Sequence, residues 1–261
     1  MTIIEPKSLP ELKAFLCSIF PSLTIDNISV LGEGWDSTAL LVDDCLVFRI
    51  PKHPTASQQM AKEVRVLEAI RPYVSAQVPN VEWVGRVRGH SLVFAMGYRK
   101  LIGAPLSDAP MRSTIDYLLQ MVGRFLVELH TVPQSVLHQA DAPWFRWTGD
   151  NSFHGPDSWE TGLRGFTDRI MQDVVPLLSE SVGKAITEFI EAFVGHPGHF
   201  QFQPVLLHGD LVPEHILFNA DTAEISIIDF GDCGIGDPAY DVWPELTSFY
   251  HGPVDDSFAK R

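Results

Sequence analysis

The sequence predicts an α+β protein built from two lobes, the first rich in strands and the second mainly helical. With 261 residues, the chain can bury a full hydrophobic core and lies at the upper edge of what one core usually spans. Short apolar runs typical of strands dominate the first part, and after Gly97 the apolar residues recur at the spacing of helices. We therefore expect lobes over residues 1–97 and 98–261.

The first lobe is predicted to hold a strand meander and one substantial helix. Residues 28–50 contain alternating apolar positions, with turn residues at 32–34 and 43–44. Residues 57–71 carry apolar side chains on one helical face. A short opening helix and two further strands complete the prediction, at residues 11–20, 81–87 and 91–98.

The second lobe is predicted to be helical, with a small polar hairpin near its end. Residues 113–130 have apolar side chains three and four positions apart, and helices continue over 162–194. A loop rich in Trp, Gly and Pro, residues 141–162, separates them. The short strands 205–208 and 225–229 are expected to pair with each other.

Composition narrows the classes of partner. The formal net charge of −14 argues against nucleic acid or an anionic membrane surface. No apolar run reaches the roughly 18 residues of a membrane span, and the N-terminus lacks the pattern of a secretory signal. Three scattered cysteines do not form a disulfide framework or a zinc site. We expect a cytoplasmic protein, and a monomer by default.

The acidic charge is concentrated toward the end of the chain. From Val205 onward there are 11 Asp and Glu residues, against only Lys260 and Arg261. Such a concentration can be a solvated surface that keeps the protein soluble. It can also line a cleft that attracts a cationic substrate, and composition does not decide between the two.

Three polar residues between residues 206 and 243 indicate chemistry. Asp210 follows a strand, His215 comes five residues later, and Asp229 ends the next strand before a Phe-Gly turn. One carboxylate can accept a proton from a nucleophile, while an imidazole and a second carboxylate can hold a divalent cation. A single Asp after a strand is usually a turn or cap residue, but that does not explain all three at this spacing.

The same segment resembles the aminoglycoside phosphotransferase family of the protein-kinase-like fold. His208-Gly-Asp-Leu-Val-Pro-Glu-His215 is similar to the kinase catalytic loop, Asp229-Phe-Gly matches its metal-binding motif, and GDPAYD follows. The resemblance covers nearly the whole chain. It implies a bilobal kinase that transfers the γ-phosphoryl group of ATP or GTP to an aminoglycoside hydroxyl with Mg²⁺, and so confers resistance.

Roles follow from this resemblance position by position. Asp210 resembles the catalytic base, and Asp229 resembles the aspartate that binds the metal. His215 stands where most kinases have Asn, which is unusual because Mg²⁺ prefers oxygen ligands. The aminoglycoside 2″-phosphotransferases and the macrolide phosphotransferases resemble this chain in having His there. The run from Asp229 to Asp241 is more similar to the 2″ group.

The first lobe supplies the expected nucleotide site. Gly32, Gly34 and Ser37 resemble the glycine-rich loop that covers the phosphates, although two glycines alone also suit any turn. Strand alternation favours Arg49 as the basic residue at the phosphates, and Lys52, the only nearby lysine, is the alternative. Glu63 is the expected ion-pair partner, or a surface charge on its helix. The hinge that binds the purine is expected at Phe94–Tyr98, including Met96, with ATP and GTP both open.

The acceptor site is expected among acidic residues after the metal aspartate. Asp232 and Glu245 are candidates to face a cationic sugar, while Asp237 and Asp241 can do the same, cap a helix or brace the catalytic loop. Members of the family typically carry further helices after the position of Asp241. The resemblance therefore implies either that this chain is truncated or that its acceptor site is more open than usual. Two other functions remain possible, a macrolide or other small-alcohol kinase and a non-catalytic nucleotide-binding module.

Overall fold

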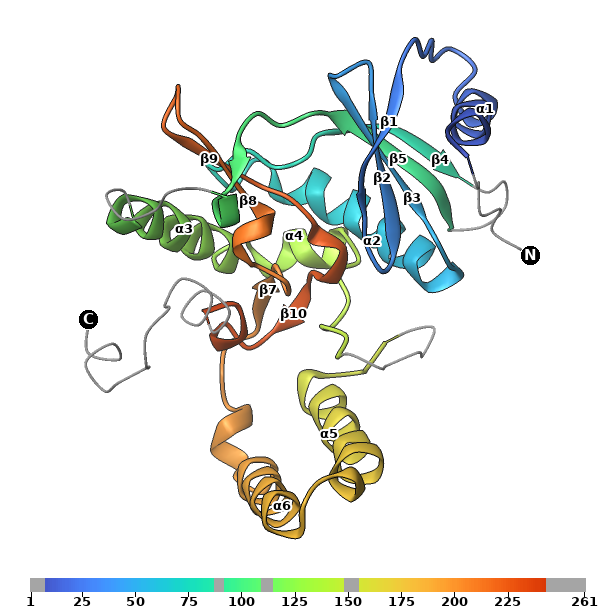
Figure 1. Ribbon diagram of the computed structural model, residues 1–261. Helices are drawn as coiled ribbons and strands as arrows, with labels where there is room; N and C mark the ends of the chain where they lie inside the picture. Colours follow the sequence, from blue (N-terminus) through green and yellow to red (C-terminus); the bar gives the residue numbers. More distant parts are fainter. Residues whose placement is uncertain (1–7, 87–91, 109–114, 148–154, 243–261) are drawn as a thin grey trace.

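The computed structural model describes residues 8–86, 92–108, 115–147 and 155–242. Its first lobe is a sheet of five antiparallel strands in the order β1-β2-β3-β5-β4 (Figure 1). The predicted meander is confirmed, and all of these strands were expected from the sequence. Their bounds are β1 Ile28–Glu33, β2 Ser37–Val42, β3 Leu46–Pro51, β4 Val81–Arg86 and β5 Val93–Arg99.

The two faces of this sheet are covered by different helices. Phe48 and Ile50 of β3 pack in one buried cluster with α1 (Leu9–Ile19). Val47, from the same strand, packs in another cluster with α2 (Pro54–Ile70). Since side chains alternate along a strand, Arg49 lies on the α2 face as Val47 does.

Helix α2 begins three residues before the predicted start. His53 is its N-cap and accepts a hydrogen bond from the backbone N–H of Ala56, and Pro54 is the first helical residue. Proline at this position loses no helical hydrogen bond and has a suitable φ. The earlier start was not predicted, because the apolar spacing that indicates the helix begins only at Met60.

The second lobe contains four α-helices and five short strands within the described residues. The predicted pairing of residues 205–208 with 225–229 is wrong: β7 pairs with β10, and β8 pairs with β9. The intervening segment Ile216–Asn219 is itself a strand and takes the place expected for β7. The bounds are β6 Ala104–Pro105, α3 Ile115–His130, α4 Gln134–Gln139, α5 Trp159–Arg169, α6 Glu180–Val194, β7 Val205–Leu207, β8 Ile216–Asn219, β9 Glu224–Ile227 and β10 Gly234–Gly236.

Short 3₁₀ and π turns connect these elements. The turn η6 (Pro213–His215) precedes β8, and η7 (Phe230–Asp232) follows β9. The remaining turns are η1 Leu106–Asp108, the π-helical η3 Ile170–Val174, η4 Val175–Leu177 and η5 Pro197–Phe200.

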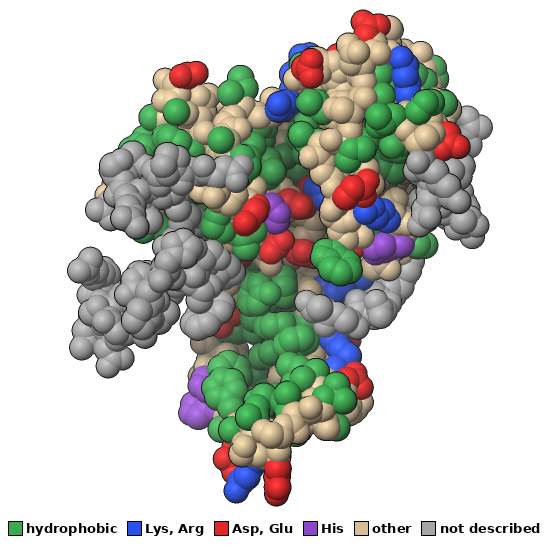
Figure 2. All heavy atoms as spheres, in the orientation of Figure 1, with side chains coloured by type: hydrophobic (Ala, Val, Ile, Leu, Met, Phe, Trp, Pro, Cys, Tyr) green, Lys and Arg blue, Asp and Glu red, His purple; other side chains and the backbone are tan. Residues whose placement is uncertain are grey.

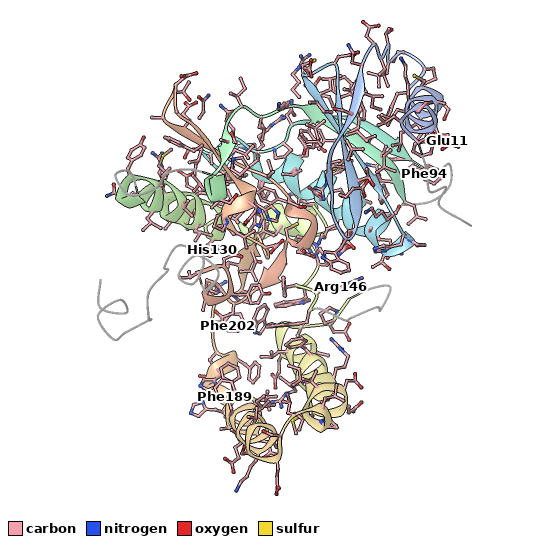
Figure 3. The ribbon with its side chains drawn as sticks, viewed as in Figure 1. Glu11, Phe94, His130, Arg146, Phe189 and Phe202 are labelled. Atoms are coloured by element: carbon pink, nitrogen blue, oxygen red, sulfur yellow. The ribbon has the colours of Figure 1, made fainter. Side chains whose placement is uncertain are left out.

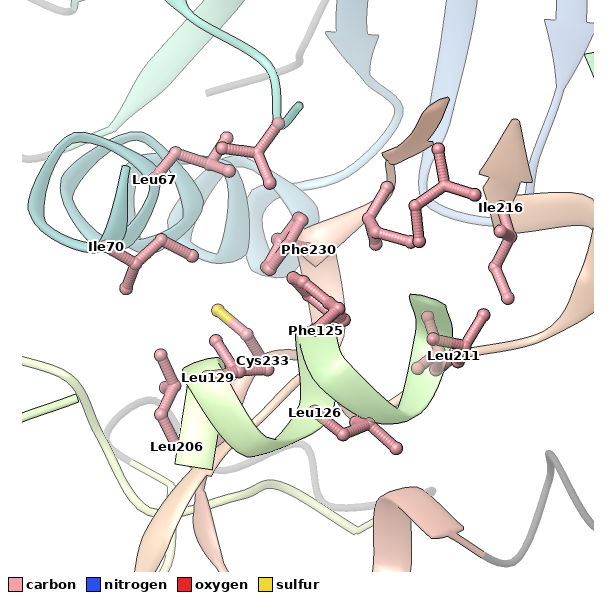
Figure 4. Packing of buried hydrophobic residues seen from close by; sticks show 14 of the residues in the cluster. Leu67, Ile70, Phe125, Leu126, Leu129, Leu206, Leu211, Ile216, Phe230 and Cys233 are labelled. Carbon is pink, nitrogen blue, oxygen red and sulfur yellow. The ribbon is translucent and has the colours of Figure 1, made fainter. Parts of the chain in front are cut away.

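Helix α2 also belongs to the core of the second lobe. Leu67 and Ile70 of α2 pack with Phe125 and Leu129 of α3 and with Phe230, which follows β9 (Figure 4). Phe125 and Phe230 meet edge to face, with ring centroids 6.4 Å apart. This shared core fixes α2 against the segment that carries Asp229.

Helices α5 and α6 form an arm below the rest of the molecule (Figure 1). An aromatic cluster joins the arm to the β7–β10 strands, in the region where Figure 3 labels Arg146 and Phe202. Phe145 and Tyr240 lie at its centre, with ring centroids 4.6 Å apart. No helix among the described residues is long and apolar enough to cross a membrane.

Candidate active site

Most of the residues predicted to bind nucleotide or act in catalysis line one cleft between the lobes. A cavity of about 780 Å³ runs from the turn that carries Gly32, Gly34 and Ser37, called the glycine turn below, to the segment after β5. A smaller cavity of about 220 Å³ reaches Asp210. Figure 2 shows acidic side chains and a histidine around this hollow. The two cavities share five of their lining residues, which are Gly34, Ser37, Arg49, His215 and Asp229.

Arg49 joins three elements at the centre of the cleft. Its guanidinium lies 2.7 Å from Glu63 Oε1 on α2 and 2.8 Å from Asp229 Oδ1 after β9. Its Nε donates to Ser37 Oγ at 3.3 Å. Burial lowers the pKa of Arg49, but the carboxylates of Glu63 and Asp229 outweigh that effect and raise it. The alternative in which Glu63 is a surface charge is wrong, because its side chain is 1% exposed.

Lys52 follows β3, lies outside the cleft and contacts the glycine turn. Its Nζ contacts Glu33 Oε2 at 2.6 Å and donates to the Gly34 carbonyl at 2.7 Å. The backbone N–H of Gly34 donates to the Ser37 carbonyl and closes the turn. Of the two basic candidates, Arg49 therefore faces the cleft, and Lys52 fastens the turn that covers it.

Asp241 braces the loop that carries Asp210. It is 1% exposed and accepts hydrogen bonds from the backbone N–H groups of His208 and Gly209, at 2.8 and 2.9 Å. His130 of α3 contacts the same carboxylate at 3.0 Å. Gly209 has φ +86°, and a Cβ there would lie 2.6 Å from the Asp232 carbonyl oxygen. This bracing leaves the Asp210 side chain 47% exposed at the cleft.

His208 supports the same loop from inside the protein. Burial lowers the pKa of this fully buried imidazole. Its Nε2 lies 3.0 Å from the Ile228 carbonyl, and its Nδ1 accepts from the backbone N–H of Asp210. The neutral ring therefore connects the strand end at Ile228 to the loop that carries Asp210.

His215 presents one ring nitrogen to Asp229. Its Nδ1 lies 2.7 Å from the Asp210 carbonyl oxygen, which can only accept, so Nδ1 carries the proton. The other ring nitrogen, Nε2, faces Asp229 Oδ2 at 3.7 Å. Asp229 adopts the left-handed φ of 65°. Burial raises the pKa of Asp229, and Arg49 and His215 reverse the shift, so its pKa is lowered overall.

These two side chains fit a magnesium site that is shared with a nucleotide. Nε2 of His215 and the carboxylate of Asp229 face each other, and the Asp210 carbonyl fixes the orientation of the imidazole ring, as is usual for histidines that bind metals. Among the described residues, no group of three His, Cys, Asp or Glu side chains could enclose a metal ion. Mg²⁺ usually has few protein ligands and completes its shell with phosphates and water.

The acidic candidates for the acceptor site have different surroundings. Asp232 is an exposed residue at the mouth of the smaller cavity, where partial desolvation and the nearby carboxylates of Asp210 and Asp229 raise its pKa. Asp237 accepts from the backbone N–H of Ala239 and caps a turn. Of the two roles expected for Asp241, the structure has the bracing of the loop and not the binding of substrate, because the carboxylate is buried and accepts hydrogen bonds from that loop. Glu245 lies outside the described residues.

The predicted hinge is displaced by several residues. Phe94 and Met96 lie within β5, and Met96 is fully buried in the core of the first lobe. The chain crosses between the lobes after β5, over residues 100–103, and only Tyr98 of the three named candidates lines the cleft. Placing Phe94 and Met96 in the hinge is therefore wrong, because the strand continues to Arg99 before it leaves the sheet.

Sequence reasoning missed several residues at the site. Trp35, at the tip of the glycine turn, is 97% exposed and lines the smaller cavity. Lys62 of α2 donates to backbone carbonyls of the Asp229 loop. The lysine beside Glu63 was a detectable signal, since adjacent helix positions point in directions only about 100° apart.

The chain matches the model of the phosphotransferase enzyme family over residues 27–261. Its fold is similar to that of the GDP and kanamycin complex of APH(2″)-IIIa, with a TM-score of 0.78 and 27% identity, covering 91% of this chain and 77% of the other. The GDP complex of wild-type aminoglycoside 2′-phosphotransferase-IIIa has a TM-score of 0.77 and 27% identity, with coverage of 93% and 79%.

A macrolide 2′-phosphotransferase from Brachybacterium faecium, MphH, shares the fold at a TM-score of 0.66 and 21% identity, with coverage of 91% and 77%. The predicted bilobal kinase-like α+β fold is thus confirmed. The chain belongs to the phosphotransferase enzyme family and is an enzyme with a hydroxyl group as phosphoryl acceptor.

Proposed function

We propose that this enzyme transfers the γ-phosphoryl group of ATP or GTP to a hydroxyl of an aminoglycoside, as a 2″-type kinase that confers resistance. The observation that carries the proposal is the convergence of Arg49, Glu63 and Asp229 beside Asp210 in one cleft. Phosphoryl transfer depends on positioning and on charge stabilisation, and this set of residues supplies both.

The first lobe holds the nucleotide. The larger cavity offers apolar surface for a purine next to the crossing segment, from Val47, Leu101, Leu217 and Ile228. Arg49 and the glycine turn lie at its other end, where the phosphates of a nucleotide would meet a cation and backbone N–H groups. Glu63 keeps the guanidinium in place by a 2.7 Å ion pair.

Asp229 and His215 would hold Mg²⁺ together with the phosphates. When bound there, Mg²⁺ would supply positive charge beside the phosphates during transfer. The Nδ1–H of His215, held by the Asp210 carbonyl, keeps Nε2 available as a ligand. Arg49 occupies one oxygen of Asp229 and leaves the other directed toward His215.

Asp210 is the proposed catalytic base. Its carboxylate lies at the cleft with Nδ1 of His215 at 3.5 Å, and the loop that carries it is braced by Asp241. The acceptor hydroxyl gives its proton to Asp210 as its oxygen forms a bond to the γ-phosphorus. The bond from the γ-phosphorus to the bridging oxygen breaks, and the nucleoside diphosphate leaves.

The charge of the smaller cavity favours a cationic acceptor. Its described lining residues include one Arg, Arg49, and no Lys. They include five carboxylates, those of Asp36, Glu63, Asp210, Asp229 and Asp232. Amino groups of an aminoglycoside would complement this imbalance and be steered toward the cleft. Kanamycin and gentamicin complexes of similar folds support the same class of acceptor.

A panel of acceptors tests the proposal. The purified enzyme is incubated with Mg²⁺ and γ-labelled ATP or GTP, in parallel with kanamycin, gentamicin, a macrolide, choline and no acceptor. We expect label on an aminoglycoside and regiochemistry at the 2″-hydroxyl by NMR. Label on the macrolide or on choline alone would show that the acceptor is not an aminoglycoside. Binding of nucleotide without any transfer would favour a non-catalytic nucleotide-binding module.

A further inference from the structure

Lys62 fastens helix α2 directly to the loop after Asp229. Its Nζ donates to the carbonyl oxygen of Gly231 at 2.8 Å and to that of Cys233 at 2.7 Å. The residue is 9% exposed although it carries a charge. Among the described residues, no carboxylate lies within ion-pair distance of this ammonium group. A buried lysine whose bonds go to two backbone carbonyls of one loop fixes the path of that loop.

The neighbouring residue holds Asp229 by a separate route. Glu63 binds Arg49, which in turn binds Asp229 Oδ1. Helix α2 therefore controls this aspartate twice: Glu63 acts on the side chain through Arg49, and Lys62 acts on the backbone that follows it.

The backbone of Asp229 needs such support. Its φ of 65° is a left-handed conformation that a residue with a side chain rarely adopts, so the surrounding structure must hold it in place. Phe230 anchors the loop on its apolar side, fully buried against Phe125. Lys62 supplies the polar anchor on the side of α2.

We propose that Lys62 is a positioning residue for the metal site, which sets the direction of the Asp229 carboxylate by holding the backbone of residues 231–233. Lys62 lines neither of the two cavities that meet at Asp229, so its role is one of positioning. The inference rests on the proposed function, in which Asp229 binds Mg²⁺ with the nucleotide.

The test compares Lys62→Met with the wild type and with Lys62→Arg. Methionine keeps the apolar stem but removes the ammonium group, and leaves two carbonyls without their donor. Lys184→Met is the matched control, because Lys184 is a 75% exposed lysine on the α6 arm. The measurement is the phosphoryl-transfer rate at saturating nucleotide and acceptor as a function of Mg²⁺ concentration.

Lys62→Met should lower kcat by about tenfold to a hundredfold, the cost of misplacing a catalytic group by about an ångström. The half-saturating Mg²⁺ concentration should rise by about tenfold, while the acceptor KM changes by less than about threefold. Lys62→Arg, which retains charge and donors, should recover most of the loss, and Lys184→Met should behave as the wild type. Metal-free nucleotide binding and the unfolding transition establish that each variant is folded.

An unchanged rate and Mg²⁺ dependence in Lys62→Met would overturn the inference. If that variant does not fold, Lys62→Gln takes its place, and an unchanged Mg²⁺ dependence there has the same meaning. Asp229→Asn separates this failure from that of the proposed function. Full activity of Asp229→Asn would refute the proposed metal site itself, whereas an inactive Asp229→Asn beside a normal Lys62→Met would refute only the role of Lys62.

Discussion

Removing Arg49 tests how the cleft is held together. Arg49→Met deletes the guanidinium that contacts Glu63, Asp229 and Ser37, and leaves Glu63, whose side chain is 1% exposed, without its cation. Removal of one partner from a buried ion pair costs about 3–5 kcal/mol. The Asp229 side chain is 40% exposed, so its share is that of a surface pair, about 0–1 kcal/mol.

The loss should depend on pH in a defined direction. Burial raises the pKa of Glu63 to about 7 even though Arg49 opposes the shift, and without Arg49 this pKa rises further. A carboxyl whose pKa is higher in the folded than in the unfolded state contributes less stability as pH rises through that interval. In the wild type, the destabilisation that comes from Glu63 stops growing near pH 7. In Arg49→Met it continues to grow above pH 7, by up to about 1.4 kcal/mol per pH unit.

Urea unfolding of the wild type, Arg49→Met, Glu63→Met and the double variant measures these effects. At pH 8 each single variant should lose about 3–5 kcal/mol. At pH 6 the loss in Arg49→Met should be about 1–2 kcal/mol smaller, whereas the loss in Glu63→Met should be larger, because protonation of Glu63 stabilises the wild type and this variant lacks the group. The double variant should be more stable than the sum of the two losses implies, by about 2 kcal/mol. Additive losses that are equal at pH 6 and pH 8 would refute the buried ion pair.

Three further changes have definite expected outcomes. Asp241→Asn has one acceptor oxygen for the two N–H groups of His208 and Gly209, so unfolding should require about 1–3 kcal/mol less and kcat should fall; unchanged calorimetry and kcat would contradict this. Gly209→Ala places a Cβ 2.6 Å from a carbonyl oxygen at φ +86°, so turnover should be lost, and wild-type kinetics would show that the loop yields. Lys52→Met should change stability by less than about 1 kcal/mol and weaken nucleotide binding less than Arg49→Met does in a side-by-side titration; the opposite order would make Lys52 the phosphate ligand.

Much of the fold could be predicted because its local patterns agree with its tertiary structure. Strand β2 buries Leu40 and Val42 and leaves Leu41 between them partly exposed, as its apolar pattern predicts. The turn at Asp43-Asp44 uses residues that tolerate the left-handed φ values of 49° and 56°. The pairing of β7 could not be predicted in this way. Residues 216–219 are equally apolar, and which strand pairs with Ile225–Ile227 is decided by the connections.

The meeting of Asp210, His215 and Asp229 at one cavity could be predicted from their spacing, but the environments of the neighbouring acidic residues could not. Asp237 and Asp241 are both acidic residues after the same loop, and only the fold buries one of them under His208 and Gly209. The end of β5 could not be located either, since Phe94–Tyr98 is apolar both as a core strand and as a hinge. Tertiary pairing to β3 and β4 extends the strand to Arg99.

The central claim is that Asp210 accepts the proton of an acceptor hydroxyl in a metal-dependent phosphoryl transfer. The most direct measurement follows γ-phosphate transfer to kanamycin in a single turnover, by the wild type and by Asp210→Asn, with nucleotide affinity determined in parallel. We expect Asp210→Asn to bind nucleotide within about threefold of the wild type and to lose at least about a hundredfold in rate, the contribution of a positioned base. Transfer at the wild-type rate by Asp210→Asn would contradict the claim.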